Sequence, residues 1–241
     1  MSEINEKSTF LISTGLLASF LSINNPRVYA ASTTTTPSPA TAETPISAPL
    51  ELPTNGGTNP TPPSNTKDPA SSSDPGNKSN NPTVAFGIAY EPGTFTIPST
   101  KLLETGSQTI PVTMPQNSGT FDVGVKDKTR ETMGWSLKAQ VVWDNGEKGM
   151  SIQTAHTGTN AKVNTGNGQL VDAPAGSVTA VPNVEITSDA QVLLMSGTQG
   201  FVHNDTYDYG LGQVSLKIAD TKTTPAGTHT GHVEWNLSVA P

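Results

Sequence analysis

The 241-residue chain contains no cysteine, which excludes disulfide bonds, thiolate metal sites and thiol catalysis. Basic residues are also scarce, because 13 Lys and Arg stand against 20 Asp and Glu and give a net charge of −7. Proteins that bind nucleic acid usually present a basic face that neutralises phosphates. We therefore expect no nucleic-acid partner for this chain.

Long hydrophobic runs are missing as well. The longest apolar stretch, residues 9–23 (TFLISTGLLASFLSI), carries no charge but is too short and too interrupted to predict a membrane span. Val28 and Ala30 then place small residues at positions −3 and −1 of a cleavage site after Ala30. Residues 1–30 are therefore predicted to be a secretory signal peptide, although Glu3 and Glu6 outweigh Lys7 where a positive charge is usual. The alternative, a buried helix of a cytosolic domain, lacks a following segment against which to pack.

Aromatic residues are absent from residues 31–82, a tract that holds 11 of the 20 prolines. Such a segment buries too little apolar surface to offset its ordering entropy, so it is predicted to be a disordered Pro/Thr/Ser-rich spacer. Within it, residues 52–56 (LPTNG) are similar to a sortase signal but have Asn55 where Thr is required. We therefore expect any surface attachment to be non-covalent.

Alternating apolar residues dominate the rest of the chain, residues 83–241. The pattern predicts strands in seven segments: 83–90, 108–114, 120–125, 135–143, 191–195, 213–218 and 231–239. Polar outer faces and intervening turn signals indicate an all-β domain, either an antiparallel sandwich or a flattened barrel. Residues 150–182 are irregular and rich in Gly, Asn and Thr, so we expect large loops there.

Two tripeptides of the same form stand about a hundred residues apart, Trp135-Ser136-Leu137 and Trp235-Asn236-Leu237. The second lies close to the C-terminus, after the run Thr224–Thr228 (TPAGT) and the stretch Tyr209–Gly212 (YGLG). Together they resemble the WxL domain of Gram-positive surface proteins, over residues 83–241. The predicted leader and spacer match the usual organisation of that family.

The resemblance implies a secreted protein at the cell wall that binds peptidoglycan non-covalently. It also implies a membrane-anchored WxL-interacting protein as a partner, with other WxL proteins as further candidates. Two alternatives stay open: an adhesin or subunit that binds a host or matrix protein, and a module that binds a WxL-interacting protein alone.

The candidate binding residues are the four that the tripeptides supply, Trp135, Leu137, Trp235 and Leu237. Trp143 joins them because it precedes the Asn145-Gly146 turn and is expected to be more exposed. Trp and Leu two positions apart share one face of a strand. These residues are therefore either core or a surface that stacks on sugars or a partner, and the sequence leaves both readings open.

The chain contains neither of two common catalytic motifs, G-x-S-x-G and H-E-x-x-H. We expect no enzyme, no cofactor and no metal site, although carboxylates paired in space would be invisible in a sequence. Three polar groups are interpreted as ordinary surface features: His229 with His232; Asn204 with Asp205 and Asp208; and the basic cluster Lys126, Lys128 and Arg130.

Overall fold

The computed structural model describes residues 41–63, 76–114 and 120–240. The predicted signal peptide, residues 1–30, lies outside this range. Among the described residues, no helix is long and apolar enough to cross a membrane. Residues 41–49 have no secondary structure and are exposed, whereas Leu50–Pro241 forms one compact unit.

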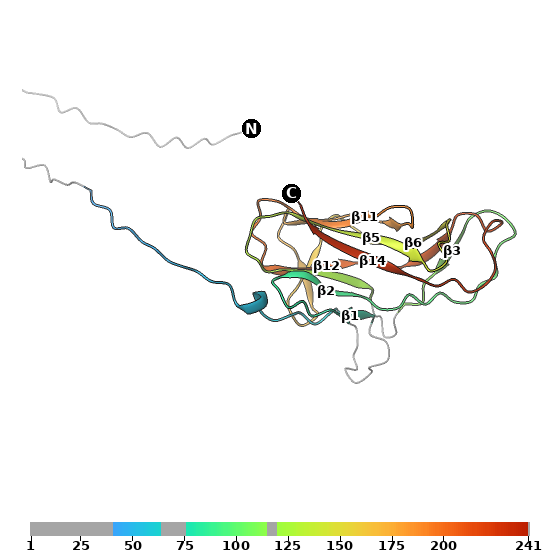
Figure 1. The fold of residues 1–241 in the computed structure, drawn as a ribbon, viewed down its shortest axis with the longest axis horizontal. Coiled ribbons are helices and arrows are strands. Elements are labelled where there is room, and N and C mark those ends of the chain that lie inside the picture. The colour runs from blue at the N-terminus through green and yellow to red at the C-terminus, as the bar shows by residue number, and fades with distance from the viewer. Residues whose placement is uncertain (1–40, 64–75, 115–119, 241) are drawn as a thin grey trace, which may run out of the picture. The chain divides into compact units, whose positions relative to one another are not determined.

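The compact unit is all-β, as predicted (Figure 1). Its described residues form fourteen strands in three antiparallel sheets that do not close into a barrel, and one 3-10 turn, η1 (Thr54–Gly56). The first sheet has the order β1 (Asn77–Ser79), β2 (Phe86–Pro92), β4 (Asp122–Asp127), β12 (Asp205–Gly210), β7 (Lys162–Asn164), β8 (Leu170–Asp172). The second has the order β10 (Glu185–Ile186), β6 (Met150–Gln153), β13 (Ser215–Ile218), β3 (Gln108–Pro111). The third has the order β14 (Gly231–Val239), β5 (Trp135–Trp143), β11 (Val192–Gly197), β9 (Val178–Ala180).

The strands β5 and β14 begin and end where the alternation of the sequence predicted. Along β5 every second residue is buried, from Trp135 to Trp143, and the residues between are half-buried. β5 pairs with β14 over nine residues and with β11 on its other side, so it is the central strand of the third sheet. Its inner face packs on the first sheet, where the Trp135 ring lies 5.9 Å from that of Tyr207 on β12.

The expectation of large loops over residues 150–182 is wrong. This region contributes four short strands, β6 to β9, which belong to all three sheets. Each has three or four residues, too few for a period of two to be recognised. β6, β7 and β9 are stabilised by pairing with strands that are distant in sequence, and β8 pairs with β7. The strand β12 also escaped prediction, because its outward positions carry the polar side chains of Thr206 and Asp208.

The compact unit also begins earlier than residue 83, where the sequence placed the end of a disordered spacer. Residues 77–79 form β1 against β2. Three buried side chains of the first sheet donate hydrogen bonds to the segment before it: Lys126 Nζ to Gly57 O (3.1 Å), Asn164 Nδ2 to Thr61 O (2.8 Å) and Asn77 Nδ2 to Pro63 O. These bonds satisfy three backbone carbonyl groups of residues 57–63, which composition alone could not reveal.

Candidate functional site

The structure brings the two W-x-L tripeptides together on neighbouring strands. In the antiparallel register of β5 and β14, Leu137 lies directly opposite Leu237. Trp235 lies opposite Ala139, and Trp135 lies opposite Val239. The four side chains therefore occupy the same face of one strand pair, although the tripeptides are a hundred residues apart.

Trp135 and Leu137 belong to the core. They are 1% and 0% exposed. Trp135 packs against Tyr207 and His203, and its ring lies over Gly197, where any Cβ atom would overlap the indole. Both side chains are enclosed by the residues packed around them, so the core reading holds for these two residues.

Trp235 and Leu237 are in a different position, because β14 is the edge strand of its sheet. Both side chains pack against the core but remain half-buried, since no further strand covers them among the described residues. Trp143 is buried rather than exposed, which corrects the sequence expectation. Its indole N–H donates to Met150 O at 3.3 Å, and this bond ties the ring to the neighbouring sheet.

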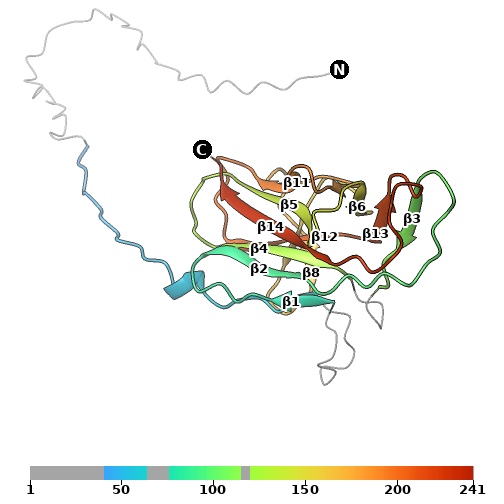
Figure 2. The same ribbon diagram turned by 45° about the vertical axis from the view of Figure 1, so that its right-hand side comes forward.

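A groove of about 500 Å³ opens between β14 and the chain that leaves β2. Figure 2 shows β14 lying across the same side of the molecule as β2. The walls of the groove are apolar and include two tryptophans: Phe95, Ile97, Val141, Trp143, Val233 and Trp235. Its rim is polar, with Lys78, Glu91, His229 and His232.

The compact unit has two further hollows. One of about 570 Å³ shares Ile97, Trp143 and His229 with the groove and is lined by residues 224–228. The other, of about 240 Å³, lies at the opposite end of β14, between Val239 and Met133. The groove is the hollow that β14 itself lines most, and its apolar walls suit the flat faces of sugar rings or the side chains of a partner.

His229 on the rim is held by two acceptors. Its Nδ1 lies 2.9 Å from a Glu147 carboxylate oxygen, and its Nε2 lies 3.0 Å from Pro225 O. Both nitrogens donate when the ring is protonated, and the bond to Glu147 raises the pKa of His229. His232 points outward from β14 and is exposed, so the two histidines do not converge on a metal.

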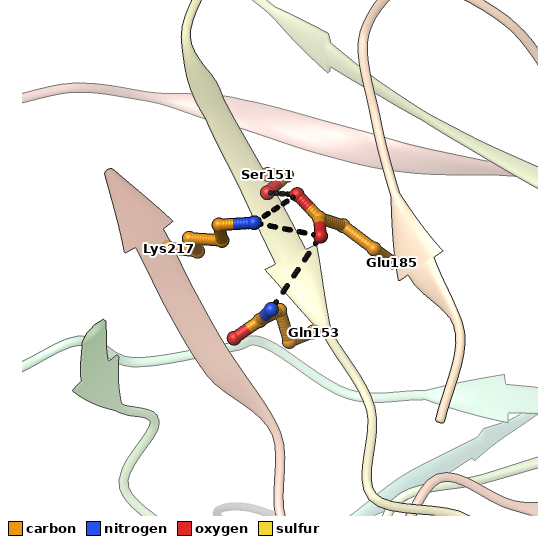
Figure 3. Close-up of polar contacts among 4 residues, drawn as sticks. All are labelled: Ser151, Gln153, Glu185 and Lys217. Carbon is orange, nitrogen blue, oxygen red and sulfur yellow. Dashed lines mark hydrogen bonds and ion pairs between the residues drawn. The ribbon is translucent and has the colours of Figure 1, made fainter. Parts of the chain in front are cut away.

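A group on the second sheet combines a serine with a lysine, as some nucleophilic sites do (Figure 3). The hydroxyl of Ser151 donates to Glu185 at 2.7 Å, and the Lys217 ammonium donates to both oxygens of that carboxylate, at 3.1 and 2.9 Å. Lys217 and Ser151 lower the pKa of Glu185, so the carboxylate is a weak base that cannot activate the hydroxyl. The group links β6, β10 and β13, and we interpret it as a cross-strand contact that stabilises the sheet.

The acidic residues around Tyr207 do not form a loop that could surround a cation. They lie on or beside β12, where alternate side chains point to opposite faces, so Asp205 and Asp208 diverge. Asn204 accepts a hydrogen bond from Arg130. Among the residues that the structure describes, no three His, Asp or Glu side chains gather as a metal site would require.

The basic cluster is not a free surface patch. Lys126 is fully buried, and its ammonium donates to Gly57 O and to Asn59 Oδ1 at 2.8 Å. Burial lowers the pKa of Lys126, with a smaller effect from Lys128. Lys128 in turn donates to Thr58 O. The cluster anchors residues 57–59 and offers little charge to an anionic polymer.

A buried polar network, which the sequence analysis did not predict, lies near that segment. Tyr90 donates to Asp208 at 2.7 Å, and Asn77 donates to Asp122 at 3.0 Å. Burial, together with the nearby charge of Asp122, raises the pKa of Asp208 well above its usual range. Its second oxygen has no partner among the described residues. The network is enclosed, so it cannot serve as a binding site.

No protein-family model, curated protein or solved structure matches the chain. A function must therefore be inferred from the groove beside β14 and from the residues that line it.

Proposed function

We propose that this protein is a secreted binding module that attaches non-covalently to the Gram-positive cell wall, with peptidoglycan as its ligand, and that it takes part in surface complexes. The paired W-x-L tripeptides and the predicted leader support this proposal from the sequence. The observation that carries it is the aromatic groove along β14, where Trp235 is half-buried and open to a ligand.

The groove suits a glycan for a physical reason. Sugar rings have one apolar face, which packs on an aromatic ring, and hydroxyl groups around it that need polar partners. Trp235 and Phe95 supply the aromatic surface, and Glu91 and Lys78 supply hydrogen-bonding groups at the rim. The groove volume lies within the range of small-molecule sites, about 300–1,000 Å³.

The test is retention of the full chain on purified peptidoglycan. Trp235→Ala and Phe95→Ala are expected to weaken retention by about tenfold or more, since aromatic residues dominate the binding energy of such sites. Phe201→Ala is the matched control, because Phe201 is 38% exposed and does not line the groove. Equal retention of all three variants, each still folded at the temperature of the assay, would contradict the proposed site.

A zymogram of the same samples tests whether the protein is a glycan hydrolase instead. We expect no cleared band, because Lys217 and Ser151 lower the pKa of Glu185 and leave its carboxylate a weak base. A cleared band that disappears in a Glu185→Gln variant would reverse this interpretation.

A second candidate function is binding to a protein partner, such as a membrane-anchored WxL-interacting protein or a host or matrix protein. The free edge of β14 favours it. A chain that is not retained by peptidoglycan but is retained by an immobilised partner protein would make this the primary function.

A further inference from the structure

The edges of the three sheets differ in how they are protected. Five of the six edge strands are very short: β1, β8 and β9 have three residues each, β10 has two, and β3 has four and includes Pro111. Short edges and prolines are devices that prevent another chain from pairing with a sheet. The sixth edge, β14, has nine residues, contains no proline, lysine or arginine, and keeps an unbroken register with β5.

The free side of β14 presents backbone groups of known identity. Asp144 N–H donates to Thr230 O at 2.9 Å, and Ala240 N–H donates to Gly134 O at 2.7 Å. Hydrogen-bonded positions alternate along an antiparallel pair, so the even-numbered residues of β14 bond to β5. The N–H and C=O groups of the odd-numbered residues point away from β5: Gly231, Val233, Trp235, Leu237 and Val239. No described residue bonds to them.

Three of these odd-numbered residues have side chains that line a hollow. Val233 and Trp235 line the groove, and Val239 lines the hollow at the far end. A strand added to β14 would therefore do two things at once. Its backbone would pair with the free groups, and its inward side chains would enter the apolar hollows beneath.

We propose that β14 is the acceptor for an extended segment of a partner protein, whose apolar residues alternate and fill the groove. This inference deepens the proposed role in surface complexes and rests on it. The charge of β14 indicates which residues the partner segment carries on its outward face. Its one ionised outward side chain, Glu234, is half exposed and favours a lysine or arginine on the outward face of the added strand.

A second copy of this chain does not fit the site. In a symmetric pair of β14 strands, the inward side chains of each copy, such as Trp235, would stay packed on their own core. The groove of neither copy would then be filled. The apolar side chains of a flexible segment are not packed on a core of their own. Such a segment can therefore pair with the backbone of β14 and also fill the groove.

The test uses the full chain and a nine-residue synthetic peptide in which valine alternates with lysine and threonine. Amide hydrogen exchange, followed by NMR, distinguishes the two sets of residues. Without peptide, the amides of Val233, Trp235 and Leu237 are expected to exchange faster than those of His232, Glu234 and Asn236. Saturating peptide should slow the odd-numbered set by about tenfold or more. A peptide with proline at its central valine should not.

Two variants of one residue isolate the backbone contribution. Leu237→Ala and Leu237→Pro both remove the leucine side chain, but only the proline also removes the outward N–H. We expect Leu237→Pro to bind the peptide about tenfold more weakly than Leu237→Ala, the difference that about 1.4 kcal/mol makes. If the proline variant is unfolded, Glu234→Lys is tested instead. We expect this variant to bind a peptide with glutamate in place of lysine more tightly than the original peptide.

Absence of protection at saturating peptide would overturn the proposal. The proposal would also be overturned if the odd-numbered amides were protected without peptide and sedimentation showed a dimer. A second copy would then occupy the edge. No wall material is present in these experiments. A failure here therefore leaves peptidoglycan binding standing, and loss of wall retention leaves the strand pairing standing.

Discussion

Tyr90 on β2 and Asp208 on β12 reach each other across an intervening strand, and the Tyr90 hydroxyl donates to the Asp208 carboxylate at 2.7 Å. Both residues lie in register with Gly124 on β4, between them. The tyrosine ring occupies the space above this glycine, where a Cβ atom would overlap it. The pair is buried, so its stability depends on the charge of Asp208 and on the packing of the Tyr90 ring.

The first prediction concerns pH. Burial and the Asp122 charge raise the pKa of Asp208 in the folded protein, whereas an aspartate in the unfolded chain titrates near pH 3.9. The folded state therefore holds its proton more tightly, and the contribution of Asp208 to the free energy of unfolding falls as pH rises above about 4. Asp208→Asn removes this effect, so its stability relative to the natural protein should increase between pH 4 and 7, by about 1 kcal/mol or more.

Urea denaturation at several pH values measures that difference. Asp189→Asn is the control, since Asp189 is exposed. A difference that stays constant across the pH range would mean that Asp208 is not penalised by its burial.

The second prediction concerns Gly124. Gly124→Ala places a methyl group against the Tyr90 ring, and overpacking of this kind costs about 1–3 kcal/mol. The cost should shrink when Tyr90 is also replaced by alanine, because the ring that causes the overlap is gone. A double-mutant cycle in urea measures the coupling, and additive effects would show that the two residues do not collide.

The third prediction separates the two tryptophans of the W-x-L tripeptides. Trp135→Ala empties a fully enclosed site and should cost about 3–5 kcal/mol in the free energy of unfolding. Trp235→Ala removes a half-buried ring at a sheet edge and should cost about half as much, which leaves a folded protein for binding assays. Thermal and urea unfolding of both variants measure the two losses in the free energy of unfolding. Equal costs would place Trp235 in the core on energetic grounds.

The fourth prediction concerns His229 on the groove rim. Its raised pKa, caused chiefly by the bond to Glu147, means that the contact stabilises the fold fully below about pH 6.5, the ordinary histidine value. The stabilisation is lost as pH rises through the pKa of the folded state. His229→Gln should therefore destabilise the protein more at pH 5.5 than at pH 8.5, by about 0.5–1 kcal/mol.

Melting temperatures at the two pH values check this effect, with His232→Gln as the matched control on the exposed face of β14. If His232→Gln shows the same pH dependence as His229→Gln, the Glu147 contact is not its cause.

The sequence by itself determined the all-β class and the two strands that carry the W-x-L tripeptides. Alternation with period two is a local property, and over nine residues, as in β5 and β14, it is long enough to define both ends of a strand. The short strands β6 to β9 fell below that length. The strand β12 was hidden because its outer face carries buried polar residues such as Asp208.

The tertiary structure alone decided which of the candidate residues can meet a ligand. Trp135 and Trp235 have the same local pattern, but β5 is flanked by strands on both sides and β14 on one. Strand order arises from pairing between distant segments, which no local pattern records. The same reason explains why residues 57–63 are ordered: their partners, Lys126 and Asn164, lie far along the chain. One tryptophan is therefore core and the other lines an open groove.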